Sequence, residues 1–258
     1  MFEEYYGPLP DRDAYLERIG LRGEALPPTA ETLHRLVSAH IASVPFENLD
    51  VYERGLCPDL SIQGLFDKIV VRRRGGYCFE LNGLFQKLLE ALGYSCYSVV
   101  MRGLREGSIA YPAHRGLVVS LPEGKAYCDV GFGGAVPFWP AYLDGTPTPD
   151  GFRVEKCGDE LYILAPGPDG GVRTQMFVDV PAYPVDFIPL NIHMSQWPES
   201  YFRMKHMASL RTENGGVSID GDLLRIRSGG QTEERKLRSR AELYDALREH
   251  FGIELPIA

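Results

Sequence analysis

One of the five cysteines in the sequence has neighbours that suit a nucleophile. Cys78 follows the glycine pair Gly75-Gly76 and stands where the most regular apolar period of the chain begins. A thiol at a helix N-terminus lies near the positive end of the helix dipole and near free backbone N–H groups, and both favour its thiolate form. The glycines allow a tight turn and leave room for a ligand. The local sequence also fits a buried structural cysteine, because cysteine is often a small core residue.

A cysteine that acts as a nucleophile through repeated turnovers needs a base for its proton and a third group to orient that base. His114 stands at the start of one β-rich run, and Asp129 stands at the end of the next. Residues 122–125 between the two runs are typical of a turn, so we expect a hairpin with both side chains at one end. Taken singly, each residue also fits an ordinary structural role.

A glycine-rich segment, residues 131–134, follows Asp129 directly. Such a turn could expose backbone N–H groups to a phosphate. It lacks the Lys-Ser/Thr ending of a nucleotide-binding P-loop and the glycine spacing of dinucleotide-binding folds. By itself the segment is weak evidence for a phosphate site.

Apolar periods in the first third predict the helices that position Cys78. Residues 33–41, 62–70 and 81–92 each repeat apolar side chains at helical spacing. Thr29 and Ser61 are expected to cap the first two helices, and Gly93 to end the third.

From Tyr94 onward the pattern changes to short β-rich runs separated by turn residues. These runs are residues 97–100, 117–121, 126–130, 152–154, 161–164 and 172–180. Strands without helices between them favour an antiparallel sandwich or barrel. Residues 139–151 are expected to form a loop. Further on, residues 223–226 and 234–237 indicate two strands, and a capping box at 239–242 opens a final helix that stops at Gly252.

Composition excludes several classes of function. The 258 residues include 27 Lys and Arg against 35 Asp and Glu, a formal charge of −8, which argues against binding to nucleic acid or anionic membranes. No apolar stretch reaches the ~20 residues of a membrane helix, and the first residues do not resemble a signal peptide. The cysteines include no Cys-x-x-Cys pair, which argues against a disulfide scaffold or a zinc cage. We expect a soluble, cytoplasmic protein.

These features occur in an order that resembles the arylamine N-acetyltransferase family. The resemblance rests on four motifs and a C-terminal pattern, which together cover about residues 44–202. They are residues 43–50 (SVPFENLD), 74–82 (RGGYCFELN), His114 and 129–134 (DVGFGG), then Asp186, Phe187, Asn191, Ser195, Pro198, Ser200 and Phe202.

The resemblance implies an α+β fold in three parts. These are an N-terminal helical bundle over residues 1–93, a central antiparallel β-barrel over 94–190 and a C-terminal α/β lid over 191–258. It also implies a papain-like triad of Cys78, His114 and Asp129. The triad would take an acetyl group from the co-substrate acetyl-CoA and pass it to an aryl amine or hydrazine, without a metal.

Three further residues are implied to support this site. Glu47 and Arg74 match positions that resemble a structural ion pair, which would clamp the cysteine turn, and Asn82 matches a motif position beside it. Single buried charges are rare unless they are matched, which favours the pair over two unrelated surface charges.

Substrate contacts are implied as well. Phe46 and Phe132 resemble aromatic positions of the acceptor pocket, although either also fits a plain core residue. Gly133 and Gly134 resemble part of the turn that faces the pantetheine-phosphate end of CoA.

The sequence leaves alternatives open. The same triad suits an amide synthase that uses an acyl-CoA or a carrier-bound acyl thioester, a cysteine hydrolase or transglutaminase-like enzyme, or a non-catalytic binding protein of the same fold.

Cys128 stands beside the triad aspartate where an apolar residue is expected, and would add an oxidisable thiol there. Residues 103–112 are expected to be a loop, which leaves the acceptor amine undetermined, and the oligomeric state stays open.

Overall fold

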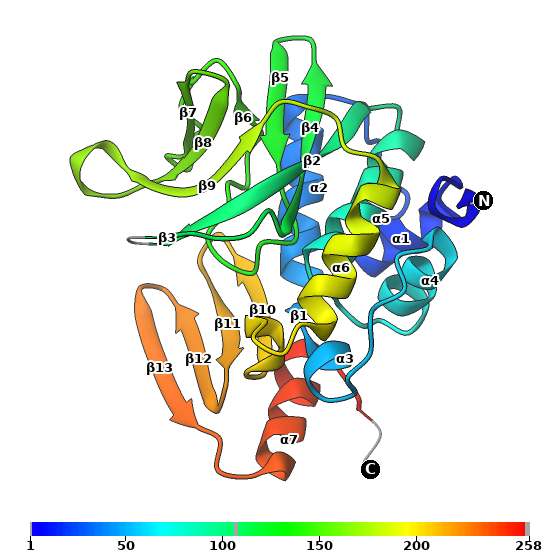
Figure 1. The fold of residues 1–258 in the computed structure, drawn as a ribbon, viewed down its shortest axis with the longest axis vertical. Helices are drawn as coiled ribbons and strands as arrows, with labels where there is room; N and C mark the ends of the chain where they lie inside the picture. The colour runs from blue at the N-terminus through cyan, green and yellow to red at the C-terminus, as the bar shows by residue number, and fades with distance from the viewer. Residues whose placement is uncertain (1, 106–107, 256–258) are drawn as a thin grey trace.

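The first third of the chain forms helices around the segment that carries Cys78. The computed structural model describes residues 2–105 and 108–255. Figure 1 shows the helices gathered on one side of the molecule. The N-terminal elements are η1 (Glu3–Tyr5), α1 (Arg12–Arg18), α2 (Ala30–Ser43), β1 (Phe46–Glu47), α3 (Leu49–Tyr52), α4 (Ile62–Phe66), η2 (Asp67–Val71) and α5 (Cys78–Ala91).

Capping side chains set the ends of the predicted helices. Thr29 Oγ1 accepts the Thr32 N–H at 3.2 Å, and Ser61 Oγ accepts the Gly64 N–H at 3.1 Å. The predicted second helix begins as α4 but continues as the π-helix η2. Gly93, with φ of +88°, lies just beyond the end of α5, as expected.

Helix α5 is held in place by its buried apolar residues. Leu81, Leu84, Phe85, Leu88 and Leu89 are all fully buried in the largest hydrophobic cluster of the protein. Burying one such side chain stabilises the fold by about 1.5–3 kcal/mol. The first residue of α5, Cys78, is therefore fixed by the packing of the whole helix.

The middle of the chain forms a curled, barrel-like antiparallel sheet. Its strand order is β6-β5-β4-β2-β9-β8-β7, and β3 pairs with β2. Helix α5 packs against β4 and β2 (Figure 1). The strands are β2 (Ser95–Arg105), β3 (Ser108–Ile109), β4 (His114–Leu121), β5 (Gly124–Cys128), β6 (Ala141–Tyr142), β7 (Arg153–Cys157), β8 (Glu160–Ala165) and β9 (Val172–Val178).

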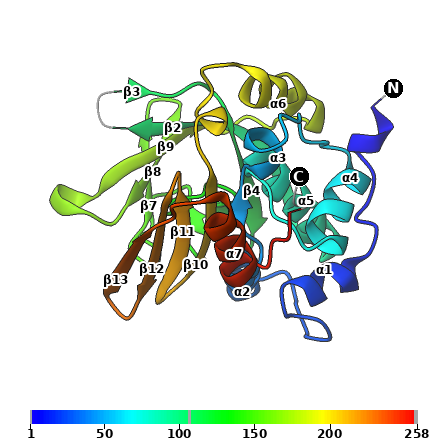
Figure 2. The same cartoon turned by 90° about the horizontal axis from the view of Figure 1, so that it is seen from below.

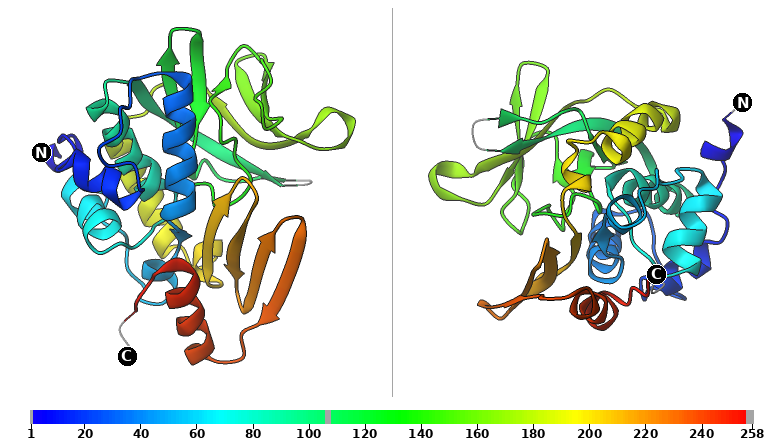
Figure 3. Two further views of the ribbon diagram at one scale, coloured as in Figure 1. Left: turned by 180° about the vertical axis from the view of Figure 1, so that it is seen from behind. Right: turned by 60° about the horizontal axis from the view of Figure 1, so that its bottom comes forward.

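A second antiparallel sheet joins the C-terminal segment to the N-terminal segment. Its order is β1-β10-β11-β12-β13, so β1 pairs with a strand about 160 residues further along the chain. Figure 2 shows α7 lying against this sheet. Figure 3 shows that the C-terminal sheet stands apart from the barrel-like sheet. The elements are η3 (Pro168–Gly170), η4 (Pro184–Asp186), α6 (Phe187–Gln196), η5 (Tyr201–Arg203), β10 (Met207–Thr212), β11 (Gly215–Asp220), β12 (Leu223–Ser228), β13 (Gln231–Lys236) and α7 (Arg240–Phe251).

The structure differs from the sequence-based expectation in three places. The segment 103–112 is not all loop, because β2 continues to Arg105 and β3 pairs with it, while residues 106–107 lie outside the described part. The loop expected over 139–151 contains the short strand β6. Helix α6 and strands β10 and β11 were not predicted.

The division into three parts, residues 1–93, 94–190 and 191–258, stays a proposal. Helix α6 runs across its boundary at residue 190.

Three hydrophobic clusters form the core, one of them shared by the helices and the barrel-like sheet. The glycine-rich turn, residues 131–134, lies where the shared cluster meets the C-terminal sheet. Within residues 2–105 and 108–255, none of the helices combines the length and the apolar character that crossing a membrane requires.

Candidate active site

Three side chains from separate elements meet at the N-terminal end of α5. Cys78 is the first residue of α5, His114 is the first residue of β4, and Asp129 directly follows β5. His114 Nε2 lies 2.6 Å from Asp129 Oδ2, which leaves Nδ1 as the ring nitrogen for the hydrogen bond with Cys78. The Cys78 thiol also lies 3.6 Å from the carbonyl oxygen of Ala113. The three side chains are 3%, 6% and 0% exposed, so the group is shielded from bulk water.

The environment keeps His114 and Asp129 charged. Burial by itself lowers the pKa of His114, but the Asp129 carboxylate and the hydrogen bonds with Asp129 and Cys78 raise that pKa to about 10. Burial by itself raises the pKa of Asp129, but the His114 charge and the hydrogen bonds from His114, Asn82 and Tyr127 lower it below its ordinary value. At neutral pH a buried imidazolium therefore stands beside Cys78.

Asp129 is held by an unusually complete set of donors. Five groups donate to its two carboxylate oxygens, and hydrogen bonds to a charged acceptor are the strong ones. They are His114 Nε2 (2.6 Å), Tyr127 Oη (2.7 Å) and Gln175 Nε2 (3.2 Å) on Oδ2, and Asn82 Nδ2 (2.8 Å) and Gly131 N (2.7 Å) on Oδ1.

Asn82 joins the helix to both strands of the hairpin. Its Nδ2 also donates to the carbonyl oxygen of Arg115 at 2.6 Å, and its Oδ1 accepts the Val130 N–H at 3.0 Å. The side chain thus fixes the distance between the first turns of α5 and the ends of β4 and β5, where the three reactive groups lie.

The β4–β5 hairpin explains why His114 and Asp129 meet. Leu117 pairs with Cys128, and continuing that register sets Asp129 opposite Gly116. Side chains alternate along a strand, so His114 and Asp129 lie on one face as diagonal neighbours. Gly116, between them, contributes no side chain. The hairpin predicted from the sequence is confirmed.

The opposite face of β5 places Cys128 away from the reactive group. Cys128 is 1% exposed and belongs to the hydrophobic cluster of the helices. Burial raises the pKa of its thiol well above the ordinary value. Cys128 is therefore a core residue, and the expectation of an oxidisable thiol beside the site is wrong.

Behind the cysteine turn lies a buried cluster of five charged residues, which we call the ion cluster. Arg74 donates to Glu47 Oε1 from Nε at 3.0 Å and from a terminal nitrogen at 2.7 Å. Lys68 Nζ lies 2.7 Å from both Asp50 Oδ2 and Glu80 Oε1. The structure thus brings Glu47 and Arg74 together, and adds three partners that sequence reasoning missed.

The ion cluster is tied directly to the backbone of the cysteine turn. Glu80 Oε2 accepts the Tyr77 N–H at 3.0 Å, and Glu47 Oε2 accepts the Leu49 N–H at 2.8 Å. Burial raises the pKa of Glu80 to about 7, with the Glu47 charge adding to that rise and Lys68 opposing it. Lys68 is therefore the cation that favours the ionised form of Glu80.

Removing Lys68 is expected to destabilise the fold strongly. Lys68→Met leaves two carboxylates without their closest cation, and breaking a buried ion pair costs about 3–5 kcal/mol of unfolding free energy. The raised pKa of Glu80 means that the folded state binds its proton more tightly than the unfolded state. Stability therefore falls as pH rises from the unfolded value toward 7, and the variant should suffer more at pH 8 than at pH 5. Denaturant unfolding at both pH values measures this.

The matched control is Lys236→Met, which removes an exposed lysine that forms a single ion pair with Asp222. This change should cost 1 kcal/mol or less. Equal unfolding free energies for Lys68→Met and Lys236→Met would contradict the view that the ion cluster clamps the turn.

Aromatic side chains pack beside the triad and the turn that follows Asp129. The Phe132 ring contacts the His114 ring edge to face, with centroids 5.2 Å apart. Phe46 lies 6.2 Å from Phe202, and Phe202 lies 5.0 Å from Tyr77, the residue before the cysteine. Such rings provide flat apolar surface with few rotatable bonds. Tyr77 and Phe202 are 0% and 1% exposed, so they support the Phe46 ring from within the core, and Phe46 and Phe132 stay the candidate acceptor contacts.

The turn after Asp129 separates these aromatic side chains from an open groove. Gly133 has φ of +74°, and a side chain there would collide with the Phe46 ring. Gly133 and Gly134 line a groove of about 600 Å³ that runs along the facing side of the C-terminal sheet. Its lining includes four basic residues, Lys205, Arg211, Arg225 and Arg227, against two acidic ones, Glu213 and Asp220. Lys205 is paired with Asp220 and Arg225 with Glu234, so the excess of positive charge in the groove is small.

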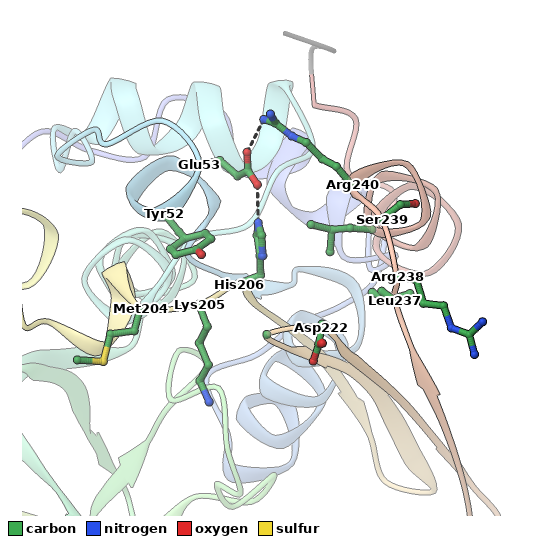
Figure 4. A pocket seen from close by; sticks show the side chains of 12 residues that line it. Tyr52, Glu53, Met204, Lys205, His206, Asp222, Leu237, Arg238, Ser239 and Arg240 are labelled. Atoms are coloured by element: carbon green, nitrogen blue, oxygen red, sulfur yellow. Dashed lines mark hydrogen bonds and ion pairs between the residues drawn. The ribbon is translucent and has the colours of Figure 1, made fainter.

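A larger cavity lies elsewhere. It measures about 920 Å³ between α3, the start of β10 and α7, and no triad residue lines it. Figure 4 shows its side chains, with Glu53 between His206 and Arg240. Both side chains contact that carboxylate. No triad residue lines the smaller groove either, but Gly133 and Gly134 of its lining belong to the turn that follows Asp129, so that groove is the one that adjoins the triad.

Comparison with known proteins identifies the family. Residues 29–258 match the profile of a protein family described as N-acetyltransferase. An arylamine N-acetyltransferase of Mycolicibacterium smegmatis is 34% identical over 255 residues, which cover 95% of this chain and 92% of the relative. The chain belongs to the arylamine N-acetyltransferase family. The family and the enzyme class predicted from the sequence, an acyltransferase, are confirmed.

Solved structures of arylamine N-acetyltransferases share the fold. The Mycobacterium tuberculosis protein aligns with a TM-score of 0.87 at 34% identity, covering 94% of both chains. The Mycobacterium marinum enzyme, solved in complex with CoA, aligns with a TM-score of 0.84 at 33% identity, covering 94% of this chain and 93% of that one. The predicted α+β fold class is confirmed.

Proposed function

We propose that Cys78, His114 and Asp129 carry an acetyl group from acetyl-CoA to an aryl amine or hydrazine. The observation that carries this assignment is the continuous chain of hydrogen bonds from Asp129 through His114 to Cys78 at the start of α5. A thiolate, a base and a group that orients the base are the three parts that cysteine acyl transfer requires.

In the first half-reaction the Cys78 thiolate attacks the thioester carbonyl of acetyl-CoA. The bond between the acetyl carbon and the CoA sulfur breaks, and the leaving sulfur takes the proton of the His114 imidazolium. Exchange between two thioesters is nearly balanced in free energy, so the acetyl group on Cys78 stays reactive.

In the second half-reaction the neutral amine attacks the Cys78 thioester. His114, now neutral, takes the proton that the amine loses, and the Cys78 sulfur leaves as thiolate. Asp129 holds the imidazole in one orientation and stabilises its charged form through both halves. The enzyme thus returns to its starting state with an amide product.

The groove suits the charged end of the donor. Arg225 and Arg227 lie two residues apart on one face of β12, and they line the groove together with Gly133 and Gly134. Arginine binds phosphate oxygens through paired donors, and CoA carries a diphosphate and a further phosphate. With the phosphates there, the pantetheine arm would pass the glycine turn toward Cys78.

The aromatic side chains suit the acceptor. Phe46 and Phe132 flank the turn, and the Phe132 ring contacts His114 directly. A flat aryl ring gains from edge-to-face or offset contacts with such side chains. An amine on that ring would lie within reach of both the thioester and the base.

The cytoplasm remains the proposed location of the protein, on the composition of the chain.

The assignment is tested by following the two half-reactions separately. Acetyl-CoA alone is expected to add one acetyl group, which intact-mass measurement and peptide mapping should place on Cys78. A panel of aryl amines and hydrazines should then remove it and yield the acetylated amine.

Three other results would contradict this function. Release of acetate without an amide product would indicate a hydrolase. Acylation only by longer acyl-CoA or carrier-bound thioesters would indicate an amide synthase. No adduct from any thioester would indicate a binding protein.

A further inference from the structure

Two side chains of β10 reach across to the glycine turn of the barrel-like sheet. A terminal nitrogen of Arg211 donates to the carbonyl oxygens of Gly134 at 2.9 Å and Val136 at 3.2 Å. Ser209 Oγ donates to the carbonyl oxygen of Gly133 at 3.3 Å. Three carbonyl groups of one short turn are thus held by a strand that lies far away in sequence.

Strand pairing fixes where these donors stand. Phe46 of β1 pairs with Ser209 of β10, and Arg211 follows two residues later on the same face. The Phe46 ring packs against Gly133 from one side, while Ser209 and Arg211 hold the turn from the sheet. The β1–β10 ladder therefore sets the position of the turn from two directions.

The first half of the turn has separate supports. Asp129 Oδ1 accepts the Gly131 N–H at 2.7 Å, and Asn82 Oδ1 accepts the Val130 N–H at 3.0 Å. These bonds belong to the triad and to α5. Residues 129–131 and residues 133–136 are thus anchored to different parts of the protein.

Arg211 also supports the wall of the groove. Its guanidinium lies 4.8 Å from the centroid of the Phe138 ring, and the Phe138 N–H donates to Asp150 at 2.7 Å. Arg211 lines both the groove and the narrow space between Phe46 and Phe132. Burial lowers its pKa, and the nearby Asp150 charge opposes that shift.

We propose that Arg211, assisted by Ser209, is a positioning residue that holds residues 133–136 in the shape that receives acyl-CoA. This inference rests on the proposed function of the groove. It makes the C-terminal sheet a part of donor recognition, because β10 supplies the donors. Loss of Arg211 should disturb the donor path and leave the triad in place.

The test compares a large and a small acetyl donor. Arg211→Met should raise KM for acetyl-CoA about tenfold, the order expected when charge-assisted hydrogen bonds are lost. The rate constant for Cys78 acetylation by p-nitrophenyl acetate, a small donor without a nucleotide, should change by less than about twofold. Arg211→Lys keeps the charge and should restore part of the affinity.

Two further variants separate the inference from a general loss of structure. Ser209→Ala, at a more accessible position, should raise KM for acetyl-CoA by a smaller factor. Arg235→Met on β13 removes an exposed arginine on the opposite face of the sheet. It should change neither KM for acetyl-CoA nor the rate constant for acetylation by p-nitrophenyl acetate. Melting curves identify any variant that does not fold.

Each other outcome would overturn the inference. An unchanged KM for acetyl-CoA in Arg211→Met would show that the turn does not depend on this residue. An equal loss with both donors would place its effect at the triad or the fold. Failure of the unmodified protein to be acetylated on Cys78 would instead contradict the proposed function, so the two failures are distinguishable.

Discussion

Cys78→Ala is expected to abolish acetylation of the protein by acetyl-CoA. Only Cys78 lies at a helix start with a charged imidazole beside it. Burial raises the pKa of Cys96 to about 12 and raises that of Cys128 well above its ordinary value, so neither supplies a thiolate at neutral pH. Intact mass after incubation with acetyl-CoA should show no adduct, while the melting temperature changes little.

The matched control for this prediction is Cys157→Ala. Cys157 is exposed at the end of β7, far in sequence from the hairpin and α5, and its loss should leave the adduct unchanged. Peptide mapping that finds the acetyl group on Cys57 or Cys157 of the parent protein would overturn the assignment of the nucleophile.

Asp129→Asn is expected to slow acetylation by about 10⁴-fold, the loss that follows when a triad carboxylate becomes an amide. The substitution keeps the shape but removes the charge that raises the pKa of His114. It also sets an amide N–H₂ group against donors, because all five partners of Asp129 donate to it. The imidazolium then loses its partner, and the thiolate loses the imidazolium.

The measurement is the single-turnover rate of acetylation between pH 5 and pH 9. In the parent, the raised pKa of His114 keeps the ring protonated through this range and deprotonation follows only near pH 10. In the variant, protonation is lost at lower pH, so the rate should fall further as pH rises.

Tyr127→Phe provides the control for Asp129→Asn. It removes one of the five donors and leaves the carboxylate charge, so the loss in rate should be about tenfold or less. If Asp129→Asn acetylated within tenfold of the parent, the helix terminus alone would activate Cys78, and Asp129 would be a turn residue.

Local sequence determined most of the elements that carry the triad. Apolar spacing predicted α2, α5 and α7, because a helix buries one face and the period of that face is visible in any short window. Thr29, Ser61 and Ser239 marked the helix starts through side-chain oxygens that accept nearby N–H groups. The hairpin that brings His114 toward Asp129 was equally local, since its turn lies between the two strands.

The extent of β2 was decided by pairing and not by its own residues. Gly103 and its neighbours indicated a loop, but residues 101–103 pair with residues 175–177 of β9. The ladder supplies backbone hydrogen bonds that compensate for a weak strand sequence. No local signal in residues 103–112 reports a partner that far along the chain.

The remaining parts of the site depend on contacts between distant segments. Nothing in the local sequence of Lys68 distinguishes it from a surface lysine, and only the folded chain sets it between Asp50 and Glu80. Likewise, the pairing of Phe46 with Ser209 brings Arg211 to the glycine turn. Local sequence signals pointed to the candidate reactive residues and predicted the helices and hairpin that bear them, because those signals are periodic and local. The tertiary structure alone decided the ion cluster and the hold of β10 on the turn, because burial and long-range register depend on the whole packed chain.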